Sequence, residues 1–251
     1  MAQHFSIDGK VLDEDQALGL FDHGRVSLDR TDWRQRKVLD MVGRLAPQGL
    51  LLDVGCYSGA FTELVRGAHP GLRPIGCDAV DDHVRLARLL YPAHPDDYRL
   101  SSVYLLDFPD NCFDCITLQE VLEHLDRPVD ALREIHRALK PGGVLIVTTP
   151  NAAAVSTLAY GAFREARAAL RRLGHRPPRV PHEIFFAESD WNRHIYAWTV
   201  PTLTTICLVN GYDYIEHCLT GDHLLSRILP GIGSIIVLAV RKTKPAPARI
   251  I

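Results

Sequence analysis

A run of apolar residues that breaks into a glycine-containing turn constrains this chain more than any other feature. Residues 50–54 read Leu-Leu-Leu-Asp-Val and continue into Gly55-Cys56-Tyr57-Ser58-Gly59, after which an amphipathic segment begins. Nineteen residues beyond Gly59, a second apolar run ends in Asp78. A strand, a tight turn onto a helix N-terminus and an acid at the tip of the next strand predict a nucleoside-binding crevice. In such a crevice, N–H groups of the turn meet the polar end of the ligand and the carboxylate accepts from both ribose hydroxyls.

The rest of the chain alternates between strand and helix patterns. Strands are predicted over 50–54, 74–78, 100–106, 115–118, 144–149, 212–219 and 234–240. Helices are predicted over 31–46, 61–68, 81–90, 129–140 and 201–210. The alternation predicts parallel pairing with right-handed crossovers, whereas the last two strands lack a helix between them and predict an antiparallel edge pair. The expected fold class is therefore α/β, a doubly wound, seven-stranded, mostly parallel sheet with an antiparallel C-terminal strand pair.

Three segments lie outside this regular pattern. Residues 1–30 are polar and weakly periodic and are expected to form an N-terminal arm, and residues 243–251 a flexible tail. Residues 150–198 are too long for a plain connection and are expected to be a helical lid inserted into the domain of residues 31–242. The lid holds a basic amphipathic stretch, which fits a phosphorylated acceptor, a membrane surface or carrier protein, or simply a solvated face.

Charge and composition exclude several classes of protein. With 28 basic and 30 acidic residues, the net charge of −2 disfavours a general nucleic-acid binder. The six cysteines are irregularly spaced, and one lone C-x-x-C does not make a zinc ribbon. The N-terminus lacks the pattern of a signal peptide, and the late apolar run of residues 235–240 is too short to span a bilayer. We therefore expect a soluble, cytoplasmic protein.

The turn itself discriminates between nucleoside cofactors. A dinucleotide site requires G-x-G-x-x-G so that the backbone can approach a pyrophosphate, but here Tyr57 occupies the middle position and no third glycine follows in place. The P-loop pattern G-x-x-x-x-G-K-[ST] is absent from the sequence. A smaller cofactor without a pyrophosphate fits better.

Several further motifs follow the turn in a characteristic order. They are Asp53-Val54-Gly55-Cys56-Tyr57-Ser58-Gly59, Asp78, Phe108-Pro109-Asp110-Asn111-Cys112-Phe113-Asp114, Val121-Leu122-Glu123-His124, Leu139-Lys140-Pro141-Gly142-Gly143 and Thr149-Pro150-Asn151. With these motifs the chain resembles the class I S-adenosylmethionine-dependent methyltransferases over roughly residues 35–242. The resemblance implies the Rossmann-like methyltransferase fold and S-adenosylmethionine as the cofactor, with S-adenosylhomocysteine as its product.

The resemblance also implies which residues bind the cofactor. These residues are Asp53, Gly55, Cys56, Tyr57, Gly59, Asp78, Ala79, Val80, Ser102, Val103 and Gln119. The turn would wrap the methionine end, Asp53 would hold the turn or the amino group, and Asp78 would take the ribose hydroxyls. Ala79 or Val80 would lie against the adenine, and Gln119 is placed for a backbone contact. Where the family often has an Asp, this chain has Ser101-Ser102-Val103, a departure at the adenine contact, although a serine hydroxyl also accepts.

Candidate catalytic groups lie in two places. Glu123 and His124 follow the fourth predicted core strand, and His194 precedes the late helix. An imidazole there would remove the proton of an acceptor hydroxyl. The alternative for His124 is a purely structural role, in which its hydrogen bonds anchor the loop.

A metal offers another interpretation of the same segment. Glu120-x-x-Glu123-His124 resembles the E-x-x-E-H of ubiquinone-pathway O-methyltransferases and small-RNA 2′-O-methyltransferases, in which a divalent metal is held, and His194 would complete the set. Because L-E-H is widespread among members without a metal, a metal site is not the favoured interpretation, and none is assigned.

The expected function is methyl transfer from S-adenosylmethionine to an oxygen of a small metabolite, sugar or natural product, with nitrogen as the second candidate for the methylated atom. One alternative is a metal-dependent RNA 2′-O-methyltransferase, against which the net charge counts. Another is a non-catalytic S-adenosylmethionine-binding partner subunit. The sequence indicates a small-molecule acceptor as the partner and makes nucleic acid a weak candidate. It identifies neither the acceptor nor the oligomeric state.

Overall fold

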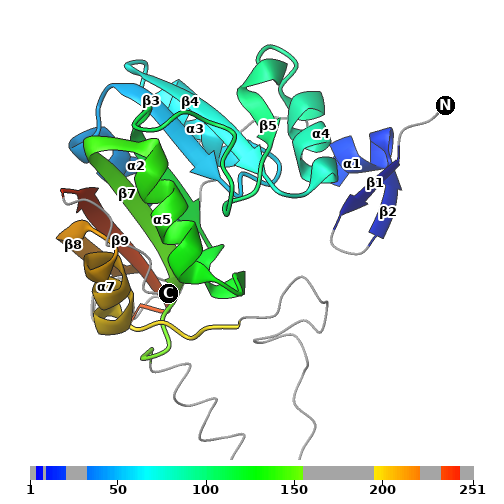
Figure 1. Cartoon of the computed structure of the whole chain (residues 1–251). Helices are drawn as coiled ribbons and strands as arrows, with labels where there is room; N and C mark the ends of the chain where they lie inside the picture. The colour runs from blue at the N-terminus through cyan, green and yellow to red at the C-terminus, as the bar shows by residue number, and fades with distance from the viewer. Residues whose placement is uncertain (1–3, 8–9, 21–32, 155–194, 221–232, 244–251) are drawn as a thin grey trace, which may run out of the picture.

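The computed structural model describes residues 4–7, 10–20, 33–154, 195–220 and 233–243 (Figure 1). Its main sheet has seven strands, which are β3 (Gly49–Val54), β4 (Leu72–Asp78), β5 (Tyr98–Leu100), β6 (Phe113–Gln119), β7 (Leu139–Pro150), β8 (Tyr212–Thr220) and β9 (Ile235–Lys242). Their order across the sheet is β5-β4-β3-β6-β7-β9-β8. The first five are parallel to one another, and β9 pairs antiparallel with both β7 and β8. The predicted fold class is confirmed.

Helices cover both faces of this sheet. They are α2 (Trp33–Leu45), α3 (Ala60–Ala68), α4 (Asp81–Leu90), α5 (Pro128–Ala138) and α7 (Val200–Val209), with short 3₁₀ turns η3 (Pro95–Asp97) and η4 (Leu122–His124). The apolar stripes of α2 and α3 share one core cluster with Leu51 of β3, and those of α5 and α7 share another with Leu52. Adjacent residues of one strand thus face opposite layers. Burial on both faces explains why the central strands are nearly continuous apolar runs.

Most predicted bounds lie within two residues of the structure, and two strands differ by more. The third strand was expected over residues 100–106, but β5 ends at Leu100, and only an isolated bridge joins Ser102 to Leu105. Leu100 and Leu105 are exposed, so the apolar letters there do not mark a buried strand. The fifth strand was expected from Val144, but β7 begins at Leu139, which pairs with Phe113 before a register shift. That shift accommodates the glycine-containing turn chemistry that had suggested a loop.

The N-terminal part of the chain forms a small unit beside α4. A two-stranded antiparallel hairpin, β1 (His4–Ile7) and β2 (Lys10–Asp13), leads into the helix α1 (Glu14–Leu20). Figure 1 shows this unit next to α4, away from β8 and β9. The described residues before α2 are thus a packed element against the domain.

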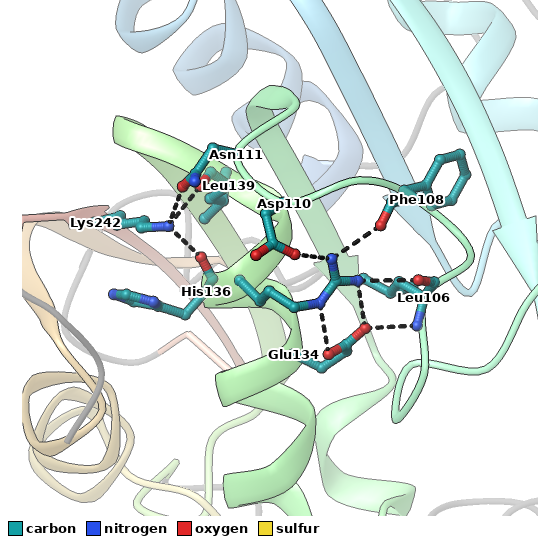
Figure 2. Close-up of polar contacts among 9 residues, drawn as sticks. Leu106, Phe108, Asp110, Asn111, Glu134, His136, Leu139 and Lys242 are labelled. Atoms are coloured by element: carbon teal, nitrogen blue, oxygen red, sulfur yellow. Dashed lines mark hydrogen bonds and ion pairs between the residues drawn. The ribbon is translucent and has the colours of Figure 1, made fainter. Parts of the chain in front are cut away.

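A polar cluster fixes the loop between β5 and β6 to α5 (Figure 2). The guanidinium of Arg137 donates to Glu134 and Asp110 and to the carbonyl oxygens of Leu106 and Phe108, at 2.6–3.0 Å. Glu134 in turn accepts from the Leu106 N–H at 2.8 Å. The loop between β5 and β6 is therefore held both through its backbone and through its side chains.

Lys242 forms a second cluster at the same, C-terminal end of α5 (Figure 2). Its ammonium donates to Asn111 Oδ1 and to the carbonyl oxygens of His136 and Leu139, each at 2.7 Å. A cation at the C-terminus of a helix satisfies carbonyls that have no partner inside the helix. The last strand is thereby joined to the end of α5.

Most of the predicted lid, residues 155–194, lies outside the described residues, and so does the tail from residue 244. All six cysteines are described, and none forms a disulfide. Among the helices in the described ranges, none combines the length and apolar character needed to cross a membrane.

Candidate cofactor and active site

A cavity of about 460 Å³ opens at the carboxyl ends of the central parallel strands. This is the size expected for a small-molecule site and the place where open α/β sheets bind ligands. Val54, Asp78 and Gln119, the last residues of β3, β4 and β6, all line it. The other lining residues are Ser6, Gly55, Tyr57, Ala79, Val80, His83, Ser101, Ser102, Val103, Tyr104, Glu120, Val121, His124 and Leu125.

The turn after β3 is held by its own N–H groups. Gly55 and Cys56 both donate to the carbonyl oxygen of Cys77, at 2.8 and 3.0 Å, and Tyr57 donates to Asp78 Oδ2 at 3.0 Å. These donors were expected to meet the ligand, but they connect the turn to β4 instead. Gly55 has φ 75° and Tyr57 has φ 50°, which is the left-handed region. A Cβ at Gly55 would lie 2.5 Å from Val121 Cγ2, so the absent side chain lets Val121 pack directly against the turn.

Asp78 is the centre of the polar wall of the cavity. Its Oδ1 accepts from the Val80 N–H at 3.0 Å and lies 3.2 Å from His83 Nδ1. The His83 ring meets the Tyr57 ring edge-on, with centroids 4.5 Å apart. The carboxylate is thus fixed on both oxygens while still lining the cavity. Oδ1 already has two partners, so the lone pair that remains for a ligand hydroxyl is on Oδ2.

Asp53 lies behind the cavity wall rather than in it. It is only 2 % exposed and accepts from Thr117 Oγ1 at 2.8 Å and Thr62 Oγ1 at 3.0 Å. Burial raises the pKa of this carboxyl to about 6, against the lowering effect of the two threonine hydroxyls. Of its two expected roles, the geometry fits the one in which Asp53 ties β3 to α3 and β6 and so holds the turn.

Cys56 and Gly59 also lie away from the cavity lining. The Cys56 side chain is buried in the apolar cluster formed with α4. Gly59 has φ 77°, and a Cβ there would lie 2.6 Å from the Tyr98 ring. Tyr98 donates to Glu63 in α3 at 2.7 Å. These two turn residues act through packing, because they allow α3 to begin directly against β5.

The wall beyond β5 contains the serines that replace the family's usual acid. The Ser101 N–H donates to the Asp78 carbonyl oxygen at 2.9 Å, and Ser102 Oγ accepts from the Tyr104 N–H at 3.3 Å. A hydroxyl that accepts locally can still donate to a ligand. The two serines offer the cavity polar contacts, and Val103 beside them offers an apolar face.

Gln119 provides an unsatisfied acceptor at the cavity. Its Oε1 is buried and has no hydrogen-bond partner. Leaving a buried carbonyl oxygen unpaired costs free energy, so a ligand N–H that reached it would be favoured.

Glu123 and His124 lie side by side at η4. His124 lines the cavity, whereas Glu123 is 1 % exposed behind it, with 3.9 Å between His124 Nε2 and Glu123 Oε1. Thr149 Oγ1 donates to Glu123 Oε2 at 3.1 Å, and Oε1 has no hydrogen-bond partner. Burial and the neighbouring charge of Glu120 raise the pKa of Glu123 to about 8. A neutral carboxyl beside an imidazole is therefore the form that the structure favours near pH 7.

The metal hypothesis finds no cluster in the described part of the chain. There, no three His, Cys, Asp or Glu side chains gather closely enough to hold a metal ion. Glu120 instead accepts from Thr148 Oγ1 at 2.8 Å and pairs with Arg34 at 3.8 Å. His194, the fourth residue of that hypothesis, lies outside the described residues, although the Ile195 N–H donates to the Glu123 carbonyl oxygen at 2.7 Å.

Several lining residues escaped the sequence-based prediction. Ser6 comes from the N-terminal unit, His83 from the first turn of α4, and Tyr104 from the loop after β5. His83 and Tyr104 follow predicted contact residues closely, so their spacing was a usable signal. Asp8-Gly9 between alternating apolar residues is a strong hairpin signal for the N-terminal unit, but nothing in it indicates contact with the cavity.

Comparison with known proteins identifies the kind of domain to which this fold corresponds. Residues 52–147, from β3 to β7, match the family model described as a methyltransferase domain. A SAM-dependent methyltransferase from Thermotoga maritima superposes with a TM-score of 0.59 at 18% identity, covering 91% of this chain and 96% of that one. Residues 52–147 are thus similar to known methyltransferase domains, and the chain shares the fold of a SAM-dependent methyltransferase.

The curated relatives match only part of the chain. The ubiquinone biosynthesis O-methyltransferase of Ruegeria pomeroyi is 35% identical over 107 residues, 40% of this chain and 41% of its own length. That of Xanthomonas oryzae is 38% identical over 104 residues, 40% and 43% of the two chains. The match thus spans less than half the length of these relatives. The [4+2]-cyclase SpnF shares the fold with a TM-score of 0.58 at 18% identity, covering 88% of this chain and 86% of that one.

Proposed function

We propose that this protein transfers a methyl group from S-adenosylmethionine to an oxygen of a small metabolite, sugar or natural product, with nitrogen as the second candidate for the methylated atom. The observation that carries the proposal is the meeting of Asp78, Gln119 and His124 in one cavity at the strand ends. The first two are complementary to a nucleoside with an amino group, and the third is a base at the same cavity.

The residues of the cavity fit the cofactor. Asp78 accepts from ribose hydroxyls, Gln119 Oε1 lacks a donor that an amino group would supply, and Val80 and Val103 offer apolar faces to an adenine. When bound, S-adenosylmethionine supplies a methyl group on a positively charged sulfur. The turn at Gly55 and Tyr57 lies in the same wall and has no basic side chain to oppose that charge.

His124 is proposed as the base that accepts the proton of the acceptor hydroxyl. It lines the cavity and is 27 % exposed, so an acceptor can reach its imidazole. Glu123 is proposed to position that ring from behind, because its carboxyl is buried and directed toward His124 at 3.9 Å. Alignment of the acceptor and exclusion of water supply the rest of the rate enhancement. His194 stays a prediction as a second base.

The relatives support oxygen as the methylated atom. Their name describes O-methylation in ubiquinone biosynthesis, but the match covers less than half of either chain, and the family match over residues 52–147 reaches neither the lid nor β8 and β9. The acceptor of this chain is therefore proposed only as a class of small molecule.

The test is a transfer assay with S-adenosylmethionine labelled on the methyl group. Pools of phenols, sugars, nucleotide sugars and amines are offered with Mg²⁺ and after chelation, and total RNA is offered in parallel. Transfer to a small-molecule pool that falls about 10²-fold or more in His124→Ala, with unchanged S-adenosylhomocysteine affinity, supports the proposal. Transfer to RNA only, lost after chelation, favours the metal-dependent RNA enzyme. Loss of small-molecule transfer after chelation instead indicates a metal-dependent enzyme for small molecules.

The same assay tests the non-catalytic alternative. The cyclase that shares this fold shows that the architecture alone does not fix the reaction. If S-adenosylhomocysteine binds but no pool is methylated and His124→Ala changes nothing, the protein is a cofactor-binding partner instead.

A further inference from the structure

The cofactor cavity has a wall that none of the family motifs contains. Ser6, in β1, lines the cavity together with Asp78, Val80 and His83. β1 belongs to a separate two-stranded sheet and reaches the cavity only because its unit docks on α4. The matched family segment begins at residue 52, so this wall is a feature of this chain outside that segment.

The docking has a buried apolar component. Phe5 and Ile7 are 1 % and 2 % exposed, and Ala17 of α1 is fully buried. They share one core cluster with the buried residues of α4, which include Val84, Leu86, Ala87 and Leu90. Strand alternation places Phe5 and Ile7 on the docked face and Ser6 on the other.

A polar contact fixes the register of the docking. The Ser6 N–H donates to Asp82 Oδ2 at 2.8 Å, and Asp82 Oδ1 accepts from Arg85 Nη1 at 2.8 Å. The Arg85 guanidinium lies over the Phe5 ring, 4.9 Å from its centroid. Asp82 does not line the cavity, so this contact can be altered without touching the ligand wall.

We propose that the N-terminal unit, β1, β2 and α1, is the outer wall of the ribose side of the cofactor site, with Ser6 as a further cofactor-contacting residue. The proposal rests on the proposed function for the identity of the ligand. Ser6 stands in the same wall as Asp78, whose carboxylate faces the ribose, and its hydroxyl is a donor and acceptor of matching chemistry. Because the ligand contacts the docked unit, binding and docking stabilise each other.

The experiment uses the full chain and S-adenosylhomocysteine. Calorimetry gives the affinity, and hydrogen–deuterium exchange gives the protection of the amides of β1 and α1 with and without ligand. We expect ligand to protect these amides in the unaltered chain. Asp82→Asn should weaken affinity about 3- to 10-fold and speed exchange in β1, and Ser6→Ala should weaken affinity similarly without speeding exchange. Asp81→Asn, an exposed acid in the same helical turn, should leave both unchanged.

The outcomes separate this inference from the proposed function. If S-adenosylhomocysteine binds the unaltered chain but Asp82→Asn and Ser6→Ala bind it equally well and β1 gains no protection, this inference alone is overturned. If the unaltered chain does not bind S-adenosylhomocysteine, both this inference and the proposed function are overturned.

Discussion

The backbone N–H of Tyr57 donates to Asp78 Oδ2 at 3.0 Å, so the turn after β3 and the acid at the end of β4 form one unit. The same carboxylate is steadied on its other oxygen by Val80 and His83. The acid is thus oriented before any ligand arrives, which lowers the entropic cost of binding. Four predictions follow from this arrangement and from its supports.

The first prediction compares two glycines with the same backbone conformation. Gly59 and Gly142 have φ 77° and 80°, but a Cβ at Gly59 would lie 2.6 Å from Tyr98, whereas one at Gly142 meets nothing within 4 Å. Gly142→Ala should cost about 1 kcal/mol from backbone strain alone. Gly59→Ala adds a steric clash and should cost about 3 kcal/mol or more. Urea unfolding measures both, and equal losses would contradict the packing role of Gly59.

The second prediction concerns the pH dependence of stability. Because burial raises the pKa of Asp53 to about 6 in the folded protein, the unfolded chain ionises first as pH rises. This residue therefore favours the fold most below pH 4, and its contribution falls by about 3 kcal/mol as pH rises from 4 to 7. Asp53→Asn should remove that fall, so the variant gains stability relative to the unaltered chain over this range.

Urea unfolding at a series of pH values checks this expectation. Asp107→Asn, an exposed acid of the same kind, is the control and should follow the unaltered chain. A stability difference between Asp53→Asn and the unaltered chain that stays constant from pH 5 to 7.5 would show that Asp53 is ionised throughout.

The third prediction concerns the support of the loop between β5 and β6. Arg137→Ala leaves two backbone carbonyls without this donor and leaves Glu134, only 13 % exposed, with the Leu106 N–H but no charged partner from Arg137. Hydrogen bonds to charged groups make this loss large, whereas the partly solvated position reduces it. We therefore expect the free energy of unfolding to fall by about 2 kcal/mol. Arg44→Ala removes ion pairs of a half-exposed side chain and should cost less than about 1 kcal/mol. Thermal or urea unfolding of both variants gives their losses of stability. A larger loss in Arg44→Ala than in Arg137→Ala would contradict the role given to Arg137.

Much of this fold can be predicted from the sequence, because the local preference of a segment for helix or strand agrees with the way the segment packs in the fold. The helix predicted over residues 81–90 is α4 with the same bounds, since its apolar period matches the face it buries. The third strand was misplaced because Leu100 and Leu105 are apolar but exposed, and only the tertiary pairing of Asp78 with Leu100 ends the strand there. Periodicity cannot show that an edge strand is short.

The site was predicted less evenly than the fold. The acid Asp78 and the rim residues Gln119 and His124 were found because motif order fixes their place at strand ends. Asp53 and Cys56 were named as cofactor contacts, yet the structure gives their side chains to internal hydrogen bonds and packing. Sequence spacing shows which residues are near a turn, but the direction of each side chain depends on what packs against it.

The fourth prediction tests the central claim, that this cavity is a nucleoside site organised by Asp78. The measurement is a calorimetric titration of S-adenosylhomocysteine into the unaltered chain and into Asp78→Ala, with Asp107→Asn as the control. We predict one-to-one binding that weakens about 100-fold or more in Asp78→Ala, because ribose hydroxyls lose a charged acceptor, and that is unchanged in the control. No binding to the unaltered chain, or equal affinity in Asp78→Ala, would contradict the account.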